Sequence, residues 1–152
     1  MLLEIDFIKY KNVLKLRKTR EVLEIYDPVR RKYLVLQPEE MVRQLVVQYL
    51  MVEKNYSLLK IRVEMGLQVN ELMKRCDILI YDNNFSPHLL VECKSAKIPI
   101  NQDVFDQIAR YNLKFKVPYL MVTNGIATYC CKIDYDTEGY QFLNEIPSWV
   151  IR

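Results

Sequence analysis

Two apolar stretches decide the fold of this chain, residues 76–81 (CDILIY) and residues 88–94 (HLLVECK). Both are rich in aliphatic and β-branched residues, which favour strands. The segment Asp82-Asn83-Asn84 between them is strong turn chemistry, because Asn and Asp tolerate the left-handed backbone of tight turns. We therefore predict two antiparallel strands joined by a short turn.

The neighbouring segments extend this pair into a sheet. Residues 61–67 alternate apolar and polar side chains and predict a strand that completes an antiparallel meander. Residues 99–114 predict a helix, with Asn101 or a neighbour as its cap, and residues 118–123 predict an apolar strand. A strand, a helix and a strand with short links form a crossover, so strand 118–123 should lie parallel to strand 88–94.

Further elements flank this core on both sides. Residues 127–133, behind an Asn-Gly turn, predict another strand, and residues 22–26 and 33–36 predict an N-terminal hairpin that turns at Asp27-Pro28. The last residues, 135–152, show no clear element. Four of their apolar side chains should still pack on the core: Phe142, Leu143, Ile146 and Trp149.

A helix should begin at Pro38, because proline fits the first turn and the acids that follow complement the helix dipole. Its apolar residues recur at helical spacing and form one face: Met41, Val42, Leu45, Val46 and Tyr49. At 100° per residue, Glu39 flanks this face and Glu40 points nearly opposite to it.

The size and composition of the chain indicate a single domain over residues 1–152, with a core at about 38–133. It has 152 residues, of which 51% are hydrophobic. The fold class that we predict is α/β, in the sense of an α+β arrangement with a mixed sheet. Three glycines exclude the glycine-rich phosphate loops, and a lone histidine, His88, excludes zinc sites built on several histidines.

The cysteines and the N-terminus suggest a reducing compartment. None of the four cysteines forms a C-x-x-C pair, so we expect buried free thiols. Acids interrupt the apolar start of the chain, which is unlike a signal peptide, and no apolar run is long enough to span a membrane. A cytoplasmic protein without a membrane partner is the expectation.

Positive charge gathers at the N-terminus. The formal net charge is +3, but nine basic and five acidic residues within positions 1–32 give that segment +4. Two interpretations stay open at this point: a solvated polar segment, which we favour, and an arm that contacts phosphates.

Charged residues stand where a buried strand should exclude them. Strand alternation puts Leu90, Glu92 and Lys94 on one face, and the 14 residues between Asp77 and Glu92 suffice for a turn and return. Buried charges are costly unless they are paired or bind metal. Two carboxylates, a lysine and the backbone carbonyl of Cys93 predict a hydrolytic site for one or two divalent ions. The alternatives are a strand-edge cap for Asp77 and a surface ion pair for Glu92 and Lys94.

The second helix carries a polar residue on its predicted stripe. Val104, Gln107, Ile108 and Tyr111 follow helical spacing and should face the sheet. A buried glutamine needs partners, so Gln107 could serve the site, a phosphate or a base edge. A plain core role for Gln107 and Tyr111 is the alternative.

Four short motifs, in this order, resemble the PD-(D/E)XK nuclease superfamily: PEEMVRQ at 38–44, RCDI at 75–78, VECK at 91–94 and Q-x-x-x-Y at 107–111. They are most similar to the N-terminal nuclease domain of type I restriction enzyme R subunits. The segment YDPVR at 26–30 resembles the stand-alone members of that family. The resemblance covers roughly residues 22–130, and one position departs from it, because Cys76 replaces the proline.

This resemblance implies a restriction-endonuclease-like αβββαβ core, here with an N-terminal hairpin extension, and magnesium-dependent DNA cleavage in which manganese can substitute. Asp77 and Glu92, with the Cys93 carbonyl, would be the metal ligands and Lys94 the catalytic lysine. The remaining residues that it implicates are a helix carboxylate, Glu39 rather than Glu40, and two assisting residues, Gln107 and Tyr111.

Three functions follow in order of preference. The first is a metal-dependent DNA endonuclease of restriction or DNA-processing type, which would need a homodimer or a motor or specificity partner to cut both strands. The second is a catalytically silent, nuclease-like module for DNA binding or assembly. The third is a structural module in which the strand charges pair with one another.

Overall fold

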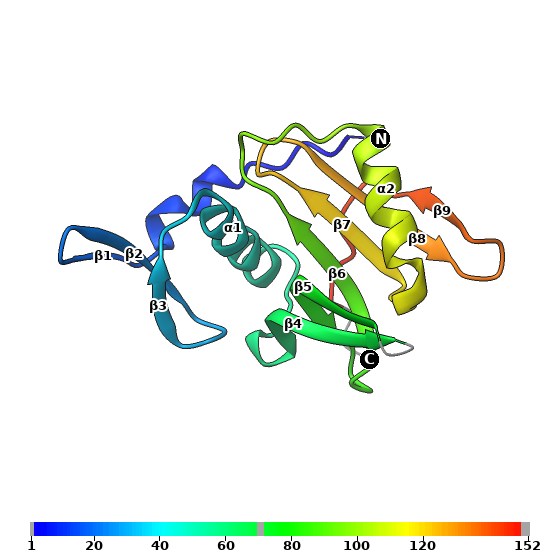
Figure 1. Cartoon of the computed structure of the whole chain (residues 1–152), viewed down its shortest axis with the longest axis horizontal. Helices are drawn as coiled ribbons and strands as arrows, with labels where there is room; N and C mark the ends of the chain where they lie inside the picture. The colour runs from blue at the N-terminus through cyan, green and yellow to red at the C-terminus, as the bar shows by residue number, and fades with distance from the viewer. Residues whose placement is uncertain (1, 70–71, 150–152) are drawn as a thin grey trace.

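The computed structural model describes residues 2–69 and 72–149, and for residues 65–76, Tyr111 and Lys114 it describes no side chain. A six-stranded sheet forms its centre, in the order β4-β5-β6-β7-β8-β9 (Figure 1). The strands are β4 (Ile61–Val69), β5 (Leu72–Tyr81), β6 (Pro87–Cys93), β7 (Tyr119–Thr123), β8 (Thr128–Asp134) and β9 (Gly139–Phe142). Short 3-10 turns lie at η1 (Ile8–Val13), η2 (Leu58–Lys60) and η3 (Leu113–Phe115).

The strand pairing confirms the predicted mixed topology. β4, β5 and β6 form the antiparallel meander, and β6 pairs parallel to β7 across the α2 crossover. β8 returns antiparallel to β7 and β9 to β8. The order α1, three strands, α2 and strand is the αβββαβ core, so the fold class predicted from the sequence is confirmed.

Helices α1 (Pro38–Val52) and α2 (Gln102–Asn112) cover opposite faces of this sheet. Alternate β6 residues divide between them: Leu89, Val91 and Cys93 pack in the α1 core, and Leu90 packs in the α2 core. The α1 core also takes in the N-terminal segment, and the C-terminal apolar residues join the two cores as expected. No helix in the described ranges has the length and apolar character needed to cross a membrane.

The predicted stripe of α2 is wrong in part, because Ile108 packs against the core as expected but Gln107 does not. Phe105 and Ala109 are fully buried, whereas Gln107 is exposed and Val104 is half-buried. Phe105 and Ala109 also have helical spacing. Phe105 removes more apolar surface from water than Val104, so the side of the helix that carries Phe105 faces the sheet. The Tyr111 side chain lies outside the described part of the structure. Asn101 caps the helix by accepting a hydrogen bond from the Val104 amide, as predicted.

A separate three-stranded antiparallel sheet precedes α1 and lies to its left in Figure 1. Its strands are β1 (Leu16–Thr19), β2 (Val22–Asp27) and β3 (Lys32–Val35), so the predicted hairpin is present with one additional strand. β1 was not predicted, because its turn to β2 consists of Arg20 and Glu21. Both have positive φ, a conformation that sequence signals assign to Gly, Asn or Asp.

A buried charge network ties α1 to both sheets. Arg43 is only 5% exposed, and its guanidinium binds Glu40 at 2.7 Å, Glu64 of β4 at 2.6 Å and Asp77 of β5 at 3.0 Å. Glu40 also binds Arg30 at 3.0 Å, and Arg30 in turn pairs with the buried Asp27. The prediction that Glu40 points away from the core is therefore wrong: two arginines draw it inward.

Arg43→Met should lower the free energy of unfolding by about 3 kcal/mol, because it leaves buried carboxylates without their cation. Arg43→Lys should recover only part of this loss, since an ammonium group cannot match the planar fork of arginine. The control is Arg110→Met, at an exposed position of α2, which should change stability by no more than about 0.5 kcal/mol. Urea unfolding followed by circular dichroism measures all three, and equal losses for Arg43→Met and Arg110→Met would contradict the role of the network.

Candidate active site

Strands β5 and β6 bring Asp77 against the segment that carries Glu92 and Lys94. Ile78 pairs with Val91, which puts the two acidic positions directly beyond the last paired residues. The Cys93 amide donates a hydrogen bond of 2.8 Å to Oδ2 of Asp77. The side chain of Asp77 therefore reaches across to the end of β6, as the 14-residue return predicted.

The end of β6 is held firmly by its parallel neighbour. Glu92 is opposite Val122 in the β6–β7 register, and the Lys94 amide donates to the Thr123 carbonyl at 2.9 Å. Glu92 is 8% exposed and Lys94 is half-buried. By strand alternation Glu92 shares a face with Leu90, as expected, while Cys93 points into the α1 core.

The loop after β7 closes the same end of the sheet with polar groups. Asn124 is buried, and its side-chain oxygen accepts from the backbone amides of Ile126 and Ala127 while its amide donates to the Ile98 carbonyl. The Thr123 and Thr128 hydroxyls are hydrogen bonded at 2.8 Å. These bonds fix the backbone beside Lys94 without using a charged group.

Glu39, in the first turn of α1, adds a second carboxylate next to Asp77. Burial raises the pKa of Glu39, and so do the charge of Asp77 and a hydrogen bond with it, while Arg43 and Lys94 oppose the shift. Its side chain is 44% exposed, unlike that of Glu40. Glu39 thus lies beside Asp77, as the preference for it over Glu40 requires. The reason differs from the predicted one: Glu40 is not turned away from the core but forms ion pairs with Arg30 and Arg43.

Arg43 and Glu64 are the two groups near Asp77 that the sequence interpretation missed. Arg43 follows Glu39 by four residues, and that spacing was a usable signal for a shared helix face. Glu64 was predicted only to face away from Ile61 and Val63 on its strand. Glu64 has a positive φ of 54°, and the β4–β5 pairing is interrupted at this residue, opposite Asp77. No sequence pattern predicts this backbone conformation.

Whether Asp77, Glu92 and the Cys93 carbonyl can hold a metal ion depends on the oxygens of Asp77. Its two oxygens are already engaged, Oδ1 by Arg43 at 3.0 Å and Oδ2 by the Cys93 amide. Within residues 2–69 and 72–149, no three carboxylate, histidine or cysteine groups are arranged to hold a metal ion. The donors themselves are carboxylate and carbonyl oxygens, which suit hard divalent ions, and the guanidinium shows that Asp77 accommodates a cation. The Cys93 thiol is buried in the α1 core, and this burial raises its pKa.

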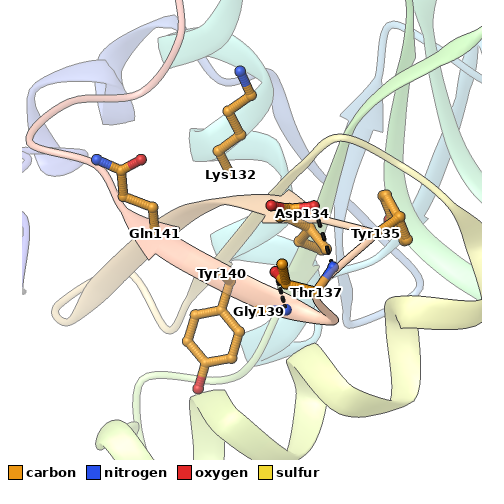
Figure 2. A pocket seen from close by; sticks show the side chains of 8 residues that line it. Lys132, Asp134, Tyr135, Thr137, Gly139, Tyr140 and Gln141 are labelled. Carbon is orange, nitrogen blue, oxygen red and sulfur yellow. Dashed lines mark hydrogen bonds between the residues drawn. The ribbon is translucent and has the colours of Figure 1, made fainter.

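Gln107 and a separate pocket lie elsewhere, and the Tyr111 side chain lies outside the described part of the structure. Gln107 is exposed on α2, with no recorded contact to Asp77 or Lys94 among the described side chains. A pocket of about 590 Å³ opens at the β8–β9 hairpin, between Lys132 and Gln141, and includes none of the predicted site residues (Figure 2). There Asp134 accepts hydrogen bonds from the amides of the turn, so the hollow follows from hairpin geometry.

Comparisons with known proteins agree with this fold. A family model described as "Type I restriction enzyme R protein N terminus (HSDR_N)" matches residues 38–147. No curated protein matches the chain. Among solved structures, a fragment described as an HsdR subunit of a type I restriction enzyme from Vibrio vulnificus YJ016 is similar at a TM-score of 0.51 and 23% identity.

The alignment with that fragment covers 74% of this chain and 24% of the other, so the likeness shows a shared fold over a quarter of the larger protein. The family model, in contrast, spans most of the present sequence, from the start of α1 to beyond β9. This protein therefore belongs to the family of type I restriction enzyme R protein N termini.

Proposed function

We propose that this chain hydrolyses phosphodiester bonds of DNA with the help of a divalent ion, Mg²⁺ or in its place Mn²⁺. The observation that carries the proposal is the contact of Asp77 with the backbone of the Glu92-Cys93-Lys94 segment, next to Glu39. The resemblance of this sequence to PD-(D/E)XK nucleases and its membership of a restriction enzyme family support it. Action on DNA, and cooperation with a second copy or with motor and specificity subunits, are parts of the same proposal.

The residues divide the work by their chemistry. Asp77, Glu92 and the Cys93 carbonyl would hold the ion, and Glu39 would complete its surroundings through water. The ion supplies a bound water of lowered pKa and neutralises charge that develops on the phosphate. Lys94, at the end of β6, would orient or deprotonate that water or donate to the phosphate oxygens. Arg43 would have to release Oδ1 of Asp77 when the ion binds, because one oxygen cannot serve both cations at full strength.

A second function has one specific observation in its favour. The guanidinium of Arg43 already binds Asp77, Glu40 and Glu64, so Asp77 has a cationic partner without a metal ion. A catalytically silent module for DNA binding or assembly would keep this arrangement. The intact set of Asp77, Glu92 and Lys94 argues for turnover instead, since a silent module does not need the lysine.

Lys94→Ala should reduce plasmid cleavage by about 10²-fold or more, in line with the loss of one preorganised group at a transition state. It should leave Mn²⁺ binding largely unchanged, because the lysine is not a ligand. Asp77→Asn should weaken both cleavage and Mn²⁺ binding. Lys97→Ala removes an exposed lysine from the same segment and should leave both unchanged.

A nicking assay and isothermal titration with Mn²⁺ measure the two properties separately. Cleavage by Lys94→Ala at the wild-type rate would refute the role of the lysine. A wild-type protein that neither cuts DNA nor binds Mn²⁺ would favour the silent module.

If Gln107 assists the site, as the resemblance to PD-(D/E)XK nucleases implies, Gln107→Ala should lower specific cleavage activity several-fold. The melting temperature should stay constant, because an exposed glutamine contributes little to packing. The control is Gln102→Ala, also exposed on α2, which should change neither property. Differential scanning fluorimetry and the nicking assay are run on the same preparations. If activity per folded molecule stays constant in Gln107→Ala, the residue does not assist the site.

A further inference from the structure

The β1–β3 sheet carries a surplus of positive charge that its own acids do not balance. Between Lys15 and Val35 there are seven basic and three acidic residues. Each acid is already paired: Asp27 with Arg30, Glu24 with Arg17 at 2.9 Å, and Glu21 with Lys18 at 3.5 Å. Four exposed cations of the sheet have no ion pair among the described side chains: Lys15, Arg20, Arg31 and Lys32.

The backbone positions of three of these cations lie at one end of the sheet. Lys32 is opposite Asp27 in the β2–β3 register, and the Arg31 amide donates to the Asp27 carbonyl at 2.7 Å. The carbonyl of Lys15 accepts from the Tyr26 amide at 2.9 Å, which brings the start of β1 to the same end. We call Lys15, Arg31 and Lys32 the basic end of the sheet.

Hydrogen bonds fix the backbone of the basic end. Asp27 is fully buried, and its carboxylate binds the amide of Val29 at 2.8 Å and the side chain of Arg30, which fixes the turn before Arg31 and Lys32. On the sheet, Lys15 lies over the Tyr26 ring at 5.4 Å, and that ring packs on Tyr33. A cation on a fixed backbone loses less conformational freedom on binding a charged surface than one on a disordered arm.

A chain of ion pairs connects the turn after Asp27 to the candidate active site. Arg30 joins Asp27 to Glu40 of α1, and Arg43 joins Glu40 to Asp77. The chain of alternating charges places the basic end beside the first turn of α1, which also carries Glu39. A polyanion that crosses the candidate active site can therefore touch the basic end at the same time.

We propose that the basic end of the β1–β3 sheet binds the phosphate backbone of duplex DNA and so positions the strand at the Asp77 site. The proposal rests on the DNA-directed function proposed above. Charge complementarity selects the occupant, because unpaired, exposed and fixed cations match a repeating array of phosphates. The sheet lies outside the part of the chain that the family model matches, residues 38–147.

The test compares two triple charge reversals that change net charge equally. One is K15E/R31E/K32E, and the control is K116E/R110E/K132E, which reverses exposed cations on α2, directly after η3 and on β8. Binding to a fluorescent duplex is measured by anisotropy in EDTA, without cleavage, at several salt concentrations. The first variant should lose at least tenfold in affinity. The slope of its log affinity against log salt concentration should become shallower by about 3, because three phosphate contacts are lost. The control should keep a salt dependence close to wild type.

Three further outcomes make the test decisive. Equal losses of affinity in both triple variants would overturn the proposal, because net charge alone would explain them. Unchanged DNA affinity in K15E/R31E/K32E would also overturn it and would favour a protein as the occupant of this surface. K15Q/R31Q/K32Q, which adds no acids, should show an intermediate loss with an unchanged melting temperature, and wild-type affinity in this variant would also overturn the proposal. Because binding is read without a metal ion, a protein that binds DNA through the basic end but never cuts it refutes the nuclease function alone.

Discussion

The guanidinium of Arg43 is the interaction on which the rest of this structure depends. It is buried under α1 and binds carboxylates from three elements, Glu40 of α1, Glu64 of β4 and Asp77 of β5. Burying a single unpaired carboxylate would cost several kcal/mol, so a cluster of them needs a cation at its centre. Arg43 supplies it, and these ion pairs act together with apolar packing to hold α1 on the sheet.

This arrangement sets two demands against each other at Asp77. Stability favours the ion pair with Arg43, whereas a metal-dependent reaction would require the same carboxylate oxygen for the ion. Functional sites commonly retain such a conflict between stability and chemistry. The neighbouring groups are placed to manage it, because Glu40 and Glu64 can retain the guanidinium when Asp77 turns to another cation. Glu39, which is partly exposed and has a raised pKa, lies farther from the guanidinium, at 3.8 Å from Arg43.

Most of the fold could be predicted because hydrophobic periodicity and short links leave few alternatives. The meander, the parallel β6–β7 pair and the start of α1 at Pro38 all follow from patterns within a few residues. The failures have a different origin. The burial of Glu40 depends on Arg30, ten positions earlier in the sequence, and β1 depends on a turn built from Arg20 and Glu21. The stripe of α2 was misassigned because two sets of residues fit the helical period, and only the packing of Phe105 decides between them.

The candidate site was predictable in its positions but not in its surroundings. Strand alternation and the return from Asp77 to Glu92 located the two ends of the site, while the cation between Glu40, Glu64 and Asp77 could not be inferred from spacing. The roles of Gln107 and Tyr111 stay predictions. They derive from a motif, and the described contacts of α2 do not bear on them.

The most direct test of the metal-dependent site is a crystal structure with Mn²⁺, using anomalous scattering to locate the ion. The account predicts an anomalous peak within coordination distance of the Asp77 and Glu92 carboxylates and the Cys93 carbonyl oxygen, with Arg43 withdrawn from Oδ1 of Asp77. A saturating soak that leaves no peak there, with Arg43 still on Asp77, would contradict it.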